Sequence, residues 1–107
     1  MKVIWLRKQY ESEGSMKDAA WQLQNRAVEL KRFVRNNPEA KAALDKIEEI
    51  AIQISQAMNE GDYEEVKELA QKAANLRSIV AFAVPDDDTA RDLFLTMSDA
   101  IRALGGY

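Results

Sequence analysis

Clusters of helix-breaking residues recur along this chain at a nearly constant interval. Four residues that mark these breaks, Gly14, Asn37, Gly61 and Asp86, are 23, 24 and 25 residues apart. Between the breaks, apolar residues recur every three or four positions, which is the spacing of one helix face and not the alternation of a strand. The pattern therefore predicts four helices, at about 15–36, 38–59, 62–84 and 86–104.

The apolar stripes of these segments define the expected core. Their members step by four and three residues in turn, as in a helix that faces its neighbours in a bundle. They are Met16, Ala20, Leu23, Ala27, Leu30, Val34, Ala40, Leu44, Ile47, Ala51, Ile54, Met58, Val66, Leu69, Ala73, Leu76, Val80, Ala83, Ala90, Leu93, Met97, Ile101 and Leu104. A second set flanks the stripes and is expected to face a further neighbour: Trp21, Val28, Phe33, Ala43, Ile50, Ala70, Phe82 and Phe94.

Residue types at the segment ends agree with this division. Good N-cap residues precede each segment: Ser15, Asn37 before Pro38, Asp62 with Glu65 three residues later, and the aspartates 86–88. Gly61 and Gly105 can adopt the left-handed conformation that ends a helix. Local signals and apolar periodicity thus place the helix boundaries at the same points.

Short connections between helices of about 30 Å favour antiparallel neighbours. The predicted fold is all-α, a single domain over 1–107, and an antiparallel up-down four-helix bundle. Residues 1–13 are ambiguous, because Val3, Ile4 and Trp5 have strand propensity. A lone strand would lack a partner, so a short N-terminal helix that docks on the bundle is the preferred interpretation.

Composition excludes several kinds of chemistry. The 107 residues contain neither cysteine nor histidine, which removes thiolate and imidazole ligands, thiol nucleophiles and the commonest general base. The aspartates 86–88 lack the glycine and glutamate spacing of a helix–loop–helix calcium site. We therefore expect no catalytic residues, no metal site and no cofactor. The longest apolar run, 79–84, is too short for a membrane span, and the charged start does not resemble a secretory signal, so a cytoplasmic or recombinant protein is expected.

Charge is divided unevenly along the chain. Residues 1–35 contain eight cations and four anions, whereas residues 36–107 contain seven cations and fourteen anions. Basic residues interleaved with aromatic ones can bind nucleic acid. With a net charge of −3, however, complementarity between the basic segment and the acidic helices is favoured over nucleic-acid binding.

The even helix lengths, the loops Asn-Asn-Pro-Glu and Glu-Gly-Asp-Tyr-Glu-Glu, and segments such as 45–50 make the chain resemble idealised, de novo designed helical bundles. In such bundles, cap, propensity and pattern agree at every junction. The resemblance implies a scaffold without enzymatic activity. Residues 1–35 depart from that style, with two tryptophans and with Gln22, Gln24 and Asn25.

Three hypotheses for function follow. The leading one is a non-enzymatic scaffold or protein-interaction module, with a protein partner or self-association through Trp5, Tyr10, Arg26, Arg32 and Arg35, because Trp, Tyr and Arg dominate interface energetics. Bulky residues outside the stripes (Trp5, Ile52, Ile79 and Leu95) fit such a surface. The second is a bundle that binds an apolar small molecule between helices, lined by Ile54, Leu69, Ala73 and Leu76. The third is an artificial catalyst with an ionisable core residue.

Overall fold

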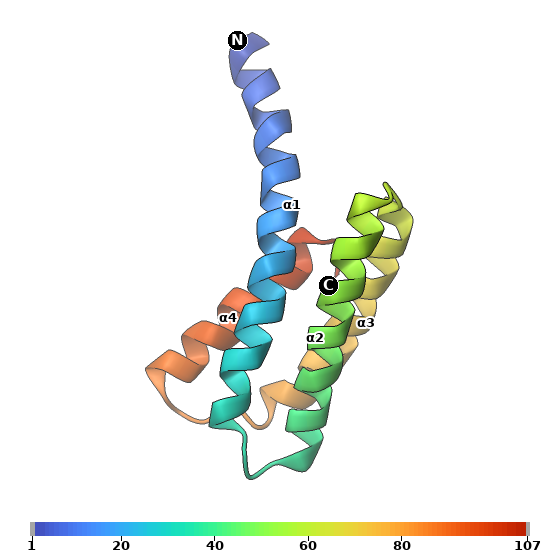
Figure 1. The fold of residues 1–107 in the computed structure, drawn as a ribbon. Coiled ribbons are helices and arrows are strands. Elements are labelled where there is room, and N and C mark those ends of the chain that lie inside the picture. The colour runs from blue at the N-terminus through green and yellow to red at the C-terminus, as the bar shows by residue number, and fades with distance from the viewer. Residues whose placement is uncertain (1, 107) are drawn as a thin grey trace.

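The computed structural model describes the backbone of residues 2–106 and the side chains of residues 16–106. In this part of the chain it contains four α-helices and one short 3₁₀ helix (Figure 1). They are α1 (Lys2–Leu30), η1 (Lys31–Phe33), α2 (Pro38–Asn59), α3 (Tyr63–Ala81) and α4 (Asp88–Ala103). The all-helical class predicted from the apolar periodicity is confirmed.

The helices pack as neighbours in a bundle. Helix α1 contacts both α2 and α4, and α2 contacts α3, whereas the contact between α3 and α4 is smaller. The molecule measures 51 × 28 × 19 Å, and its long dimension follows α1 (Figure 1). These contacts bury one continuous apolar core that draws on every helix.

The stripe residues predicted for the core lie largely where expected. All are buried except Met16, Leu76 and Ala83, which are half-buried and pack against the core. Alanine occupies much of the α2–α3 contact: Ala51, Ala70, Ala73 and Ala74 are all buried. Small side chains let helix axes approach closely. The alanines therefore allow α2 and α3 to pack closely against each other.

The first helix differs from the prediction. The expected break at Gly14 and Ser15 is absent. Of the segment 1–13, predicted as a separate docked helix, residues 2–13 are helical but form the first turns of α1. A glycine inside a helix costs only about 1 kcal/mol relative to alanine, which the flanking helix-forming residues offset. The predicted N-cap at Ser15 is therefore wrong, and α1 extends beyond the other three helices (Figure 1).

Three of the predicted caps are present. Asn37, Asp62 and Asp87 accept hydrogen bonds from the backbone N–H groups of Ala40, Glu65 and Ala90 at 3.0, 3.2 and 3.0 Å. Gly61 and Gly105 have positive φ, as predicted. Helix α3 ends at Ala81 and not at Val84. The physical reason lies in Pro85, which disfavours helical geometry in the residue before it.

Three of the flanking residues are misplaced by the prediction. Trp21, Val28 and Phe82, expected to face a neighbouring helix, are exposed. At 100° per residue, Trp21 lies about 140° around α1 from the centre of its buried stripe, on the solvent side. Phe82 follows the last residue of α3, so the early end of that helix leaves it 93% exposed.

Candidate functional site

The solvent side of α1 carries an exposed aromatic and apolar strip. Trp21, Asn25 and Val28 of α1 follow one another at steps of four and three residues, so they share one side of the helix, and Arg32 of η1 follows four residues later. Trp21 is 55% exposed and Val28 is 42% exposed. We call these four residues the α1 outer face.

Two residues of the same helix contact Trp21, Arg26 at its indole ring and Asn25 at its backbone carbonyl. The guanidinium carbon of Arg26 lies 5.8 Å from the centre of the indole ring, within the range of a cation–π contact. The same guanidinium group pairs with Glu29 at 3.4 Å. The amide of Asn25 donates to the Trp21 carbonyl at 2.8 Å. The indole is therefore a large, exposed and partly ordered surface group, the kind that anchors protein interfaces.

The predicted partner-binding residues differ in their exposure and in the element to which they belong. Arg26 is half-buried beside Trp21, whereas Arg32 in η1 and Arg35 in the following loop are exposed. The side chains of Trp5 and Tyr10 lie outside the described side chains, although their backbone belongs to α1. Residues 5, 10 and 26 therefore belong to α1, whereas Arg32 and Arg35 follow its C-terminal end.

Sequence reasoning missed Trp21 as a surface residue, although a signal was present in the chain. Ala19 is buried on one flank of the stripe, whereas Trp21 lies on the other. A small residue on one flank favours close helix contact there, and Ala100 and Ala103 of α4 line the depression beside Ala19. The side of α1 that carries Trp21 is therefore expected to face solvent.

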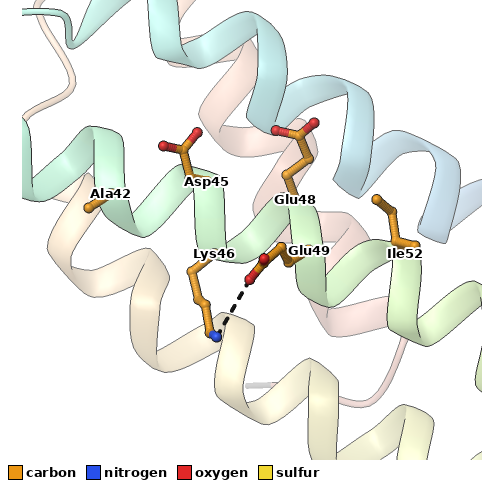
Figure 2. Close-up of a pocket in the computed structure, with 6 residues that line it drawn as sticks. All are labelled: Ala42, Asp45, Lys46, Glu48, Glu49 and Ile52. Atoms are coloured by element: carbon orange, nitrogen blue, oxygen red, sulfur yellow. Dashed lines mark ion pairs between the residues drawn. The ribbon is translucent and has the colours of Figure 1, made fainter.

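A second surface lies on α2 (Figure 2). A shallow depression of about 460 Å³ is lined by Ala42, Asp45, Lys46, Glu48, Glu49 and Ile52. Glu49 pairs with Lys46 at 3.5 Å. The depression combines two apolar residues, Ala42 and Ile52, with three carboxylates and one ammonium group that lie between them along α2.

The α1 side of this depression is closed by a bridged ion pair. The Lys31 ammonium group donates to Asp45 and to Glu48 at 2.9 Å each. These hydrogen bonds raise the pKa of Lys31 above its ordinary value of 10.5, and the bond to Asp45 has a larger effect than the bond to Glu48. Lys31 therefore joins the end of α1 to the middle of α2, which is an instance of the charge complementarity predicted between the basic segment and the acidic helices.

An apolar groove between α2 and α3 adjoins the same surface. It has a volume of about 410 Å³ and is lined by Glu39, Ala42, Ala43, Leu76 and Ile79. Ala42 lines both hollows, so the two lie next to each other on the surface. Ile52 and Ile79 are each 43% exposed, as expected for residues outside the stripes, and so is Leu95 of α4 at 52%.

The residues proposed to line an internal ligand site lie in the packed core. Ile54 and Ala73 are fully buried, Leu69 is nearly so, and Leu76 is half-buried at the α2–α3 groove. Among side chains 16–106, the buried polar residue is Ser98, whose hydroxyl makes no hydrogen bond, and no group of histidine, cysteine or acidic residues there could hold a metal ion. Lys46, Lys67 and Lys72 are exposed.

None of the helices in the described part of the chain combines the length and the apolar character of a membrane span. Comparison with protein-family models, curated proteins and solved structures finds no match.

Proposed function

We propose that this protein is a non-enzymatic helical-bundle scaffold that binds other proteins through α1. The observation that carries the proposal is Trp21, a tryptophan 55% exposed on the α1 outer face with the Arg26 guanidinium beside its ring. Exposed Trp and Arg side chains contribute disproportionately to binding energy when a partner covers them. The N-terminal extension of α1, with Trp5 and Tyr10 in its sequence, adds to the same helix.

The scaffold that we propose is an antiparallel up-down bundle. Connections of four residues (34–37), three residues (60–62) and six residues (82–87) are too short to return along a helix of about 30 Å. Packing of α1 on α2, of α2 on α3, and of α4 on α1 supports the same topology. We further propose a designed origin. Side-chain caps at the start of α2, α3 and α4 and the two glycines with positive φ support it.

Photo-crosslinking tests this proposal even when the partner is unidentified. A photoreactive amino acid at Val28, on the α1 outer face, should crosslink a protein that the same group at Leu95 on α4 does not. Both positions are about half exposed, so reactivity alone would not separate them. Binding of the crosslinked protein is then measured by calorimetry with the unmodified chain.

Trp21→Ala is expected to weaken that binding at least about tenfold, as truncation of an interface anchor does. Trp5→Ala and Arg32→Ala are expected to weaken it to a smaller extent, and Leu95→Ala is the matched control. Unchanged affinity in the Trp21, Trp5 and Arg32 variants, or equal crosslinking from Val28 and Leu95, would refute an interaction through α1.

A further inference from the structure

The surface of α2 and α3 around these two hollows has the chemistry of a docking site for a basic amphipathic helix. We define the α2–α3 surface as Ala42, Glu49 and Ile52 of α2, Ile79 of α3, and Glu39 at its end. Its isoleucines are each 43% exposed, and carboxylates of α2 lie between Ala42 and Ile52 along the helix. Figure 2 shows Asp45 and Glu48 on the side toward α1, and the Lys46–Glu49 pair on the side toward α3.

The net negative charge of α2 favours a positively charged partner on this surface. This helix contains four carboxylates (Glu39, Asp45, Glu48 and Glu49) against two lysines, Lys41 and Lys46, so its net charge is −2. Lys31 occupies the α1 side of the surface, and Glu39 and Glu49 make no ion pair with another helix among the described residues. A partner that brings cations beside an apolar stripe would therefore gain on both counts.

The chain itself contains such a segment. Residues 2–10 include three cations (Lys2, Arg7 and Lys8), no acidic residue, and the apolar or aromatic residues Val3, Ile4, Trp5, Leu6 and Tyr10. These residues form the turns of α1 that extend beyond the bundle (Figure 1). The extension is therefore an apolar and basic helix, and the other three helices do not run alongside it.

The extension cannot reach the α2–α3 surface of its own molecule. Helix α1 is continuous from Lys2 to Leu30 and packs on α2 and α4, so its first turns continue along the same axis and away from the bundle. Folding back would require breaking the helix. The occupant that matches in sequence, charge and helical form therefore comes from another molecule.

From this juxtaposition we infer that the protein forms a symmetric dimer in which the N-terminal extension of α1 in each copy docks on the α2–α3 surface of the other. Reciprocal exchange makes the contact twice about a twofold axis, as in most homodimers. The doubled contact helps a short helix to approach the roughly 1,000 Å² that a specific interface buries. This inference rests on the proposed function, because it takes α1 as the binding helix. It adds that the partner is a second copy of the chain and that the surface bound is the α2–α3 surface.

Sedimentation equilibrium of the full chain tests the inference. The unmodified chain is expected to dimerise in the micromolar range, consistent with a small interface. Ile52→Glu with Ile79→Glu should raise the dimer Kd at least about tenfold, because each replaces an exposed apolar side chain of the α2–α3 surface by a charge. Leu95→Glu, the same change at a similarly exposed residue of α4, should leave the Kd within about twofold, and circular dichroism of each variant controls for folding.

Exchange of charges between the N-terminal extension and the α2–α3 surface tests whether the extension is the segment that docks there. Reversal of Lys2, Arg7 and Lys8 to Glu should weaken the dimer, and adding Glu39→Lys and Glu49→Lys to that variant should restore it. A monomer at every concentration overturns the inference, and so does a dimer that responds to the surface variants but not to the reversal. If these surface variants have no effect while Trp21→Ala still weakens binding to a crosslinked partner, the dimer is wrong and the function proposed for α1 stands.

Discussion

Replacement of Lys31 by Met measures what holds the end of α1 against α2. The substitution keeps an apolar side chain of similar length and removes both ion pairs of the ammonium group, each 2.9 Å long. Lys31 is 24% exposed, and its partners Asp45 and Glu48 are 56% and 30% exposed. Pairs in such partly solvated positions contribute up to about 1 kcal/mol each, with the more buried Glu48 pair at the upper end. We expect a loss of about 1–2 kcal/mol in the free energy of unfolding.

Urea denaturation at pH 7 provides the assay, and Lys46→Met provides the matched control. Lys46 also pairs with a glutamate, but both groups are more than 60% exposed, so its replacement should cost less than about 0.5 kcal/mol. Because its pKa is raised, Lys31 contributes its full stabilisation below the unfolded lysine pKa of about 10.4 and loses it as the pH rises through the higher folded value. The difference between the unmodified chain and Lys31→Met should therefore be constant from pH 6 to about 9 and shrink as the pH rises beyond the ordinary lysine pKa. Equal costs for the two lysine variants, or a difference that persists at high pH, would refute this reasoning.

Two further predictions concern the ends of helices. Gly61→Ala should cost about 1 kcal/mol, because φ is +75° there and nothing lies within 4 Å of an added Cβ; Gly106→Ala should cost more, since its Cβ would overlap Ile101 and approach the Ala70 carbonyl oxygen at 2.8 Å. Thermal unfolding ranks the two, and the reverse order would contradict the close packing of the C-terminal residues on α3. Asn37→Ala should lower the unfolding free energy by about 1 kcal/mol through loss of the cap to Ala40, whereas Asn37→Asp should restore most of it; equal stability of all three chains would show that the cap does not contribute.

Much of the fold follows from local sequence signals. The stripes of α2 and α4 specify their buried faces because each combines a regular apolar repeat with a capping side chain at its start. Asn37 and Asp87 act as caps because their short acceptor side chains reach the N–H group three residues on. Such interactions involve neighbours in the chain, so they can be predicted from the sequence without the tertiary structure.

The features that could not be predicted depend on balances between residues. Gly14 has the character of a breaker in isolation, but its cost of about 1 kcal/mol is smaller than the combined propensity of the residues around it. Trp21 and Ile50 both flank their stripes, yet Trp21 is exposed and Ile50 is buried, because burial depends on which flank meets another helix. The candidate surface on α2 and α3 combines residues from two helices, and the adjacency of its two hollows at Ala42 is a property of their packing alone.

The unbroken course of α1 has a consequence for recognition. An isolated segment of 13 residues would have to nucleate a helix before it could bind, and nucleation is the unfavourable step of helix formation. In this protein the bundle supplies the nucleus, since the turns from Met16 to Leu30 are already packed. The first turns of α1 therefore need only propagation. A partner of the kind proposed above would meet a preorganised element and avoid most of the entropic cost of coupled folding.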